Sequence, residues 1–302
     1  MERIRTLNNH YRETFGEKVY KLSLDGGFTC PNRDGTIGTG GCIYCSAGGS
    51  GDFASNRALS IGEQIEEAKQ IFSSKYTGKK YIAYFQAFTN TYGPLSYLRK
   101  IYYEAIKPDE ILGLSIGTRP DCLPPETMDL LGEINQIKPV YLELGLQTCH
   151  GTTADFIRRG YPLSVFENAV YEAKKQNLNV VVHVILGLPG ETREMMVQTI
   201  QYLNTLPVDG IKLSMLHVLK GTDLADYYNN PGFPVFEQEE YIDLVIDCLE
   251  YLRKDIVVHR ITGDGPKEIL IAPLWSLNKR AVLNGIQKRL KERNTWQGRK
   301  EI

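Results

Sequence analysis

The chain has 302 residues, of which 42% are hydrophobic and 24% are charged, and its formal net charge at pH 7 is −1. This composition is typical of a soluble globular protein, with room for one large α/β domain or two small ones. The sequence has no run of eighteen apolar residues and no apolar signal-peptide core near its N-terminus. We therefore exclude membrane-spanning and secreted proteins and expect a cytoplasmic protein with reduced thiols.

Strand-like and helix-like segments alternate along the chain. Runs rich in β-branched, aromatic and aliphatic residues predict six strands, at residues 19–24, 81–87, 111–117, 140–146, 180–186 and 211–218. Helical periodicity predicts helices at residues 61–76, 94–106, 125–137, 165–176, 194–206 and 239–254. A further apolar run at residues 256–261 can extend the sheet. Near-continuous apolar strands joined by helices predict a parallel sheet that closes partly or fully into a barrel, with its chemistry at the carboxyl ends of the strands.

The last segment, residues 279–302, is a basic tail. It contains eight Lys or Arg and two Glu, whereas residues 1–278 contain 27 basic and 34 acidic residues. Such a tail can bind phosphate groups. Alternatively, Val282, Leu283, Ile286 and Leu290 repeat at helical spacing and can dock the tail as a helix. Both interpretations stay open from the sequence.

Three cysteines with a characteristic spacing follow the first predicted strand. Cys30, Cys42 and Cys45 are separated by eleven and then two residues on a glycine-rich loop. Three thiolates can hold three irons of a [4Fe–4S] cluster and leave the fourth iron open to another ligand. A zinc site normally needs a fourth protein ligand, and the nearest histidines, His10 and His150, lie outside the loop. The spacing favours the iron–sulfur cluster, with zinc and inert thiols as the alternatives.

Three further motifs fall at the ends of predicted strands, and together with the cysteines they resemble the radical S-adenosylmethionine (SAM) superfamily. They are Gly-Thr-Arg-Pro-Asp-Cys at 117–122, Glu-Leu-Gly-Leu-Gln at 143–147 with Arg-Arg-Gly at 158–160, and His-Val-Ile-Leu-Gly-Leu-Pro-Gly-Glu at 183–191. The long gap between the first two cysteines is similar to that of the Elongator catalytic-subunit branch. Residues 85–92 and 263–269 resemble a short bacterial group within it, the YtqA/YhcC (MnmL)-like proteins.

The resemblance implies the fold and the cofactors. The expected fold is a partial (β/α)6 TIM-like barrel over residues 1–278, including an N-terminal extension, followed by the basic helical extension at 279–302. The expected cofactors are a [4Fe–4S] cluster on Cys30, Cys42 and Cys45, and SAM bound to the open iron. The residues expected to contact SAM by resemblance are Tyr44, Gln86, Ala87, Phe88, Gln147, Arg159, His183, Gly187 and Leu188.

Several of these residues have simpler interpretations. Arg159 can be a surface residue beside Arg158, and His183 can be a histidine of the core. Glu143 and Arg119 are charged residues within or just after predicted strands, where an unpaired charge is costly, so they are expected to pair with each other. Two residues near the end of the sixth predicted strand, His217 and Lys220, point to the barrel rim and are candidates for acting on the substrate. The alternative is that they only make structural contacts in this loop.

The reaction implied by the resemblance is modification of the wobble uridine of tRNA. A carboxymethylaminomethyl side chain on that uridine would become an aminomethyl group. The expected partners are tRNA and an external electron donor, with the tRNA methyltransferase that acts next as a further candidate and no membrane partner. Two alternatives are a radical SAM oxidoreductase acting on a small molecule and an iron–sulfur protein without turnover.

Overall fold

A parallel sheet of seven strands forms the centre of the computed structural model, which describes residues 2–49, 51, 54–73, 78–230, 232–263 and 265–301. Neighbouring strands follow one another in the order β1-β2-β3-β4-β5-β6-β8, and every pair is parallel. The strands are β1 (Val19–Leu24), β2 (Lys80–Phe85), β3 (Ile111–Thr118), β4 (Val140–Gln147), β5 (Asn179–Leu186), β6 (Gly210–Met215) and β8 (Val257–Arg260).

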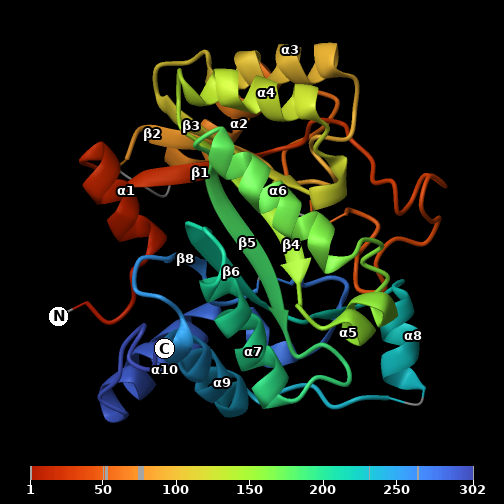
Figure 1. Ribbon diagram of the computed structural model, residues 1–302, viewed down its shortest axis with the longest axis vertical. Coiled ribbons are helices and arrows are strands. Elements are labelled where there is room, and N and C mark those ends of the chain that lie inside the picture. The colour runs from red at the N-terminus through yellow and green to blue at the C-terminus, as the bar shows by residue number, and fades with distance from the viewer. Residues whose placement is uncertain are drawn as a thin grey trace.

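Helices cover the outer face of this sheet and leave its inner face for the functional site (Figure 1). A connection between parallel neighbours must return the chain to the start of the next strand, and a helix packed on the sheet does so. Because strand order follows chain order, the sheet curls into a half-barrel, which confirms the predicted α/β barrel class. The connecting helices are α2 (Ile61–Ser73), α3 (Leu95–Ile106), α4 (Pro125–Asn135), α6 (Leu163–Lys175), α7 (Arg193–Asn204) and α9 (Gln238–Tyr251).

The sixth predicted strand differs from the prediction. The apolar run at 211–218 divides into β6 and a separate strand β7 (Val218–Leu219), which pairs antiparallel with β9 (Leu270–Ala272) at the rim. The run at 256–261 supplies β8, so the sheet has seven strands rather than six. Hydrophobicity alone does not show where a continuous apolar run leaves one sheet for another. The end of the helix predicted at 61–76 lies outside the described residues, and the short helices α5 (Gly151–Phe156) and α8 (Asp223–Asn229) were not predicted.

The two faces of the sheet carry different kinds of side chain. Apolar side chains fill the space between the strands and the outer helices, with Leu114, Leu142, Val182 and Leu213 all fully buried. The inner face carries polar and charged side chains as well, including Glu143 and Lys212. No helix in the described ranges is both long enough and apolar enough to cross a bilayer.

The N-terminal helix α1 (Leu7–Phe15) joins the two edge strands at the base of the half-barrel. Thr6 forms a parallel bridge with Val258 of β8, and α1 then leads to the start of β1. Thr6 also caps α1, because its Oγ1 accepts the Asn9 N–H at 3.3 Å. The ring of Tyr11 packs edge-on against Tyr141 of β4, 5.9 Å between ring centroids. The extension is therefore part of the barrel.

The basic tail forms helix α10 (Lys279–Glu292), which docks along α9. Val282, Ile286 and Leu290 are buried against the core, as the helical spacing suggested. Arg289 and Arg293 both pair with Asp243 of α9, so part of the positive charge of the tail is neutralised within the protein. The structure thus shows the docked helix, while the boundary drawn at residue 278 and phosphate binding by the remaining basic residues stay predictions.

Candidate active site

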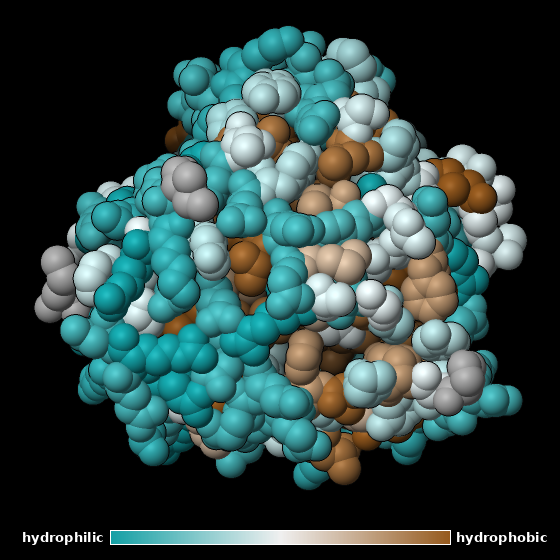
Figure 2. All heavy atoms as spheres, turned by 60° about the horizontal axis from the view of Figure 1, so that its bottom comes forward, coloured by the Kyte–Doolittle hydropathy of each residue, from teal (hydrophilic) through white to brown (hydrophobic). Residues whose placement is uncertain are grey.

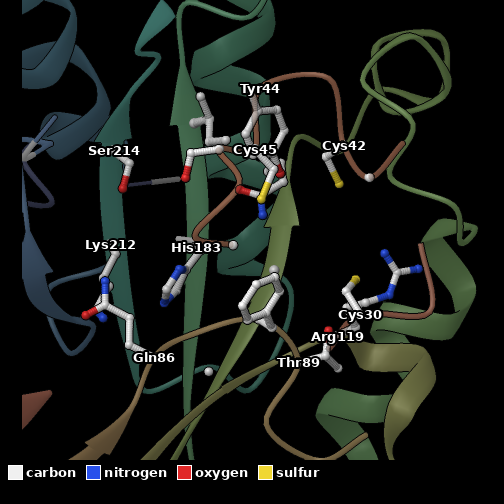
Figure 3. A pocket seen from close by; sticks show the side chains of 18 of the residues that line it. Cys30, Cys42, Tyr44, Cys45, Gln86, Thr89, Arg119, His183, Lys212 and Ser214 are labelled. Carbon is white, nitrogen blue, oxygen red and sulfur yellow. The ribbon is translucent and has the colours of Figure 1, made fainter. Parts of the chain in front are cut away.

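A cavity of about 290 Å³ lies at the carboxyl ends of the strands, where the sequence predicts the chemistry. On the face of the molecule turned forward in Figure 2, apolar side chains gather around a hollow and hydrophilic side chains cover much of the remaining surface. Ten of the candidate residues line the cavity: Cys30, Cys42, Tyr44, Cys45, Gln86, Phe88, Gln147, Arg159, His183 and His217. Figure 3 shows Cys30 and Cys42 on one side of the cavity and Lys212 and His183 on the other.

Hydrogen bonds to the backbone hold the cysteine loop in place. The Arg33 guanidinium donates to the carbonyl oxygens of Cys45, at 2.8 Å, and Ser46, at 2.6 Å. The Asn32 side-chain amide donates to the carbonyl of Arg158 at 2.7 Å and lies 3.6 Å from the Cys42 sulfur. The cysteine loop is therefore held by hydrogen bonds among its own residues and by a hydrogen bond to Arg158, which follows α5.

The three thiols of the cysteine loop line one cavity. In a [4Fe–4S] cluster each cysteine binds a different iron, so the thiols must surround a cavity rather than meet at one atom. Cys30, Cys42 and Cys45 do surround this cavity, and none forms a disulfide in the part of the chain that the structure describes. The donor set and its spacing therefore fit the cluster.

The turn after β2 packs directly against the cysteine loop. Phe88 has a positive φ of 60°, and its N–H donates to the Gly49 carbonyl at 2.8 Å. Gln86 and Phe88 line the cavity, but Ala87 does not, because it is buried beneath Gly51 of the loop. Positive φ at a non-glycine residue is strained and is found most often at functional sites.

Substitution of Gly49 by alanine is expected to loosen the cysteine loop. A Cβ at this position would lie 2.3 Å from the Phe88 ring, on a backbone whose φ of 59° already disfavours side chains. We expect lower stability and a lower iron content after anaerobic reconstitution. Gly16→Ala is the matched control, because its φ is 76° with nothing within 4 Å of the new Cβ. It should cost about 1–2 kcal/mol and leave iron binding unchanged; equal iron loss in both variants would contradict this account.

Arg159 supports the end of β4 from below the cavity surface. It is only 3% exposed, so its interpretation as a surface residue is wrong. Its guanidinium donates to the carbonyls of Leu146, at 3.0 Å, Thr148, at 2.7 Å, and Tyr161, at 3.1 and 3.2 Å. Beside it, Gln147 follows a register shift in the β4–β5 ladder and has a positive φ of 67°. Arg159 thus fixes the strained backbone at Gln147, and its direct contact with SAM stays a prediction.

Glu143 and Arg119 do not pair with each other, contrary to the expectation from the sequence. Arg119 binds Asp121 through two hydrogen bonds, at 2.9 and 2.8 Å, and also donates to the Arg159 carbonyl at 2.9 Å. Glu143 lies deeper in the half-barrel and has other partners. The two strands place these charges at different depths, which the spacing of the motifs does not show.

Glu143 is the centre of a buried group of charges on the inner face of the sheet. Its carboxylate is completely buried and accepts hydrogen bonds from Lys21 at 2.5 Å, Ser115 at 2.6 Å and Lys212, and lies 2.7 Å from Nε2 of His183. Burial alone would raise the pKa of Glu143, but Lys21 and Lys212 hold it well below its usual range. Burial and the neighbouring Lys212 lower the pKa of His183, which favours its neutral form. His183 is therefore a member of this buried group of charges and not an isolated histidine of the core.

The remaining candidates do not all reach the cavity. His217 lines it and its Nε2 lies 3.2 Å from Oγ of Ser276. Lys220 is exposed outside it, and its backbone N–H donates to Ile269. Gly187 packs against Phe236, and Leu188 lies in an apolar cluster at the rim. The structure therefore separates Ala87, Gly187, Leu188 and Lys220 from the cavity.

Among the cavity residues that were not singled out in the sequence are Tyr84, Lys212 and Arg260. Each lies inside a strand that hydrophobicity predicted to be buried. A lysine or arginine within such a strand is itself a signal, because an uncompensated buried charge is costly. Applied to 211–218 and 256–261, this criterion would have found Lys212 and Arg260.

Comparison with known proteins assigns the family. Residues 33–203 match the radical SAM superfamily and residues 208–292 match the Radical SAM C-terminal domain, so the chain belongs to the radical SAM superfamily. The chain is 46% identical over 298 residues to the uncharacterized protein YtqA of Bacillus subtilis, covering 99% of this chain and 92% of that protein. It is 39% identical over 266 residues to protein YhcC of Escherichia coli, covering 88% and 85%.

More distant matches are to Elongator-type proteins. It is 26% identical over 164 residues to a tRNA uridine(34) acetyltransferase of Methanocaldococcus jannaschii, which covers 53% of this chain and 30% of that protein. The structure of archaeal Elp3 from Methanocaldococcus infernus superposes with a TM-score of 0.68 at 16% identity, covering 92% of this chain and 64% of that one. The protein is thus a radical SAM enzyme, with a [4Fe–4S] cluster and SAM as its cofactors.

Proposed function

We propose that this enzyme modifies the wobble uridine of tRNA and converts its carboxymethylaminomethyl side chain to an aminomethyl group. The observation that carries the proposal is the likeness of 164 residues of the chain to a tRNA uridine(34) acetyltransferase. The shared Elongator-like fold supports it.

In this proposal Cys30, Cys42 and Cys45 hold the cluster, and SAM lies against Gln86, Phe88 and the side chain of Gln147. When bound, the cluster and SAM would supply a 5′-deoxyadenosyl radical, a species able to take a hydrogen atom from the substrate. The chain contributes a partly enclosed cavity, which limits the access of water to a reactive species. His217 lies at the cavity wall as a candidate proton carrier.

The bond to be broken is the one between the amine nitrogen and the carboxymethyl carbon. Loss of a hydrogen atom and then an electron from that methylene gives an imine, and water cleaves the imine to the aminomethyl uridine and glyoxylate. SAM is the stoichiometric oxidant, because its conversion to methionine and 5′-deoxyadenosine takes up the two electrons that the side chain loses. An external electron donor is therefore needed only to prime the reaction.

The test is a product analysis with purified, reconstituted enzyme under anaerobic conditions. Incubation with tRNA bearing the carboxymethylaminomethyl uridine, SAM and a reductant should yield aminomethyl uridine, glyoxylate and 5′-deoxyadenosine in a ratio of about 1:1:1. The ratio follows from the electron count above. Unchanged nucleosides together with formation of 5′-deoxyadenosine would reject the proposal and favour a small-molecule substrate.

Binding of tRNA is expected to use basic residues that the fold leaves at the surface. Arg280, Lys288 and Lys291 of α10 are exposed, in contrast to Arg289 and Arg293, which pair with α9. Phosphate contacts supply most of the affinity for nucleic acids. A tRNA methyltransferase that takes the aminomethyl product next can share this surface.

A further inference from the structure

We propose that Lys212 accepts a proton from the amine nitrogen of the substrate side chain when the carbon–nitrogen bond is oxidised. This proposal rests on the function proposed above and adds a catalytic residue to it. Lys212 belongs to β6 and lines the cavity.

The proposed oxidation releases one proton that needs an acceptor. The side-chain nitrogen is a secondary amine, which carries two hydrogen atoms when it is protonated. A hydrogen atom and an electron leave the neighbouring methylene, and the conversion of SAM takes up both, as described above. A proton leaves the nitrogen, so that a carbon–nitrogen double bond forms. Water then adds to this bond; its oxygen ends in glyoxylate and its two hydrogens end on the nitrogen. The balance therefore leaves one proton for a base at the site.

Lys212 is a buried lysine on the wall of the cavity. It is only 7% exposed, and it lines the same cavity as the three cysteines. Figure 3 shows Lys212 on the side of the cavity away from Cys30 and Cys42. A substrate group between these two sides has the cysteine loop on one side and the amine of Lys212 on the other.

The hydrogen bonds of Lys212 fit a proton acceptor. Its Nζ donates to the Tyr84 hydroxyl at 3.1 Å and to the carboxylate of Glu143. A neutral amine has two N–H groups and one lone pair, so it can satisfy both acceptors and still offer its lone pair to an N–H of the substrate. Once Lys212 has taken up the proton, the carboxylate of Glu143 beside it stabilises the ammonium. Both protonation states of Lys212 therefore have partners at this position.

The buried position also makes the neutral form of Lys212 accessible. Burial lowers the pKa of Lys212 to about 7 even though Glu143 opposes the shift. A lysine in water has a pKa of about 10.4 and is almost fully charged at pH 7. A general base is most efficient when its pKa lies near the working pH. The interior of the half-barrel thus turns an ordinary positive charge into a base.

The pH dependence of product formation should follow the charge of Lys212. The titratable and charged groups that face it come from the other strands of the sheet: Lys21, Tyr84, Glu143, His183, His259 and Arg260. The neighbouring lysines lower the pKa of Glu143 although burial opposes them. Burial lowers the pKa values of His183 and His259 and raises that of Tyr84. Product formation should therefore rise with pH through about 7 and level off above about 8, where Lys212 is mainly neutral.

The test is a single-turnover assay over about pH 6–9 with the reconstituted holoenzyme, SAM, a reductant and an anticodon stem–loop RNA that carries the carboxymethylaminomethyl uridine. Aminomethyl uridine and 5′-deoxyadenosine are quantified separately. For Lys212→Met, formation of aminomethyl uridine should fall by about 10²–10⁴-fold, the usual contribution of a general base, and the rise with pH should disappear. Because 5′-deoxyadenosine forms before the proton transfer, its ratio to aminomethyl uridine should increase from about one to more than about ten.

Three further variants separate proton transfer from charge and from folding. Lys212→Arg keeps the positive charge but cannot accept a proton in this pH range, so it should lose product formation as Lys212→Met does. Lys212→Ala should regain product formation with added ethylamine but not with tetramethylammonium, which is charged and has no proton to exchange. Lys174→Met is the matched control, because it removes a lysine paired with Asp209 outside the cavity and should behave as wild type. Iron content and circular dichroism show whether each variant is folded and loaded.

The outcomes distinguish this role from the proposed function. A wild-type rate of product formation that does not change between about pH 6 and 8 overturns the role, even if no variant folds. Product formation at the wild-type rate in Lys212→Arg also overturns it, because only charge is then needed. A rise with pH that disappears in His217→Gln and persists in Lys212→Met assigns the base to His217 instead. Absence of aminomethyl uridine with wild type rejects the proposed function and this role with it, whereas the first three outcomes reject the role of Lys212 alone.

Discussion

Replacement of Cys30, Cys42 or Cys45 by alanine is expected to abolish cluster binding and all SAM cleavage. Each cysteine supplies one iron with its protein ligand, and two thiolates on a loop do not hold a four-iron cluster. Wild type should bind about four irons per chain after reconstitution. Each variant should contain almost none and form no 5′-deoxyadenosine above the background without enzyme.

Cys149→Ala is the control for this experiment. Cys149 lies just after β4 and its sulfur accepts a hydrogen bond from Thr199, away from the cavity. Its iron content and 5′-deoxyadenosine formation should match those of wild type. Iron loss in Cys149→Ala, or full iron in any of the three loop variants, would show that the cluster uses a different set of ligands.

Substitution of Glu143 by glutamine is expected to cause the largest loss of folding stability. The change leaves Lys21 and Lys212 close together inside the half-barrel without a counter-charge. Breaking a buried ion pair by removing one partner typically costs about 3–5 kcal/mol. Urea denaturation at pH 7 measures the loss. Glu172→Gln removes an exposed pair with Lys175 and should change stability by less than about 1 kcal/mol.

The pH dependence of the folding stability and a double variant test whether the loss in Glu143→Gln is electrostatic. Because the folded-state pKa of Glu143 is depressed, its contribution is present above its unfolded pKa and is lost as the pH falls through its folded value. Acidification should therefore destabilise wild type more than Glu143→Gln. Adding Lys212→Met to Glu143→Gln should restore part of the loss, because it removes one of the uncompensated charges. Additive losses would contradict the electrostatic explanation.

The strands of the half-barrel could be predicted because they are buried on both faces. Five of the six predicted strands lie within two residues of the structure, since continuous apolar runs bounded by turns have few other interpretations. The division at Met215 could not be predicted, because Val218 is as apolar as the residues of β6 and only tertiary pairing with Ala272 removes it from the large sheet.

Only the parts of the site that lie within one local motif could be predicted from the sequence. The cysteine loop and Gln147 are local motifs, so their positions follow from chain order and strand ends. The partners of Glu143 come from β1, β5 and β6, and the spacing within one motif contains no information about them. The role of Arg159 could not be predicted for the same reason. Its guanidinium donates to backbone carbonyls that come together only when the turn has folded.

The contact between the two ends of the chain has a consequence for the order of folding. Arg3 donates to the Thr295 carbonyl at 2.7 Å, and the Gln297 side-chain oxygen accepts the Arg5 N–H at 2.9 Å. Contacts between residues so far apart in sequence close the longest possible loops and form late. During synthesis, strands β1 to β6 can therefore assemble one after another, while the base of the half-barrel is completed only after residues 295–297 have been made. Assembly of the fold thus ends at the side opposite to the cysteine loop (Figure 1).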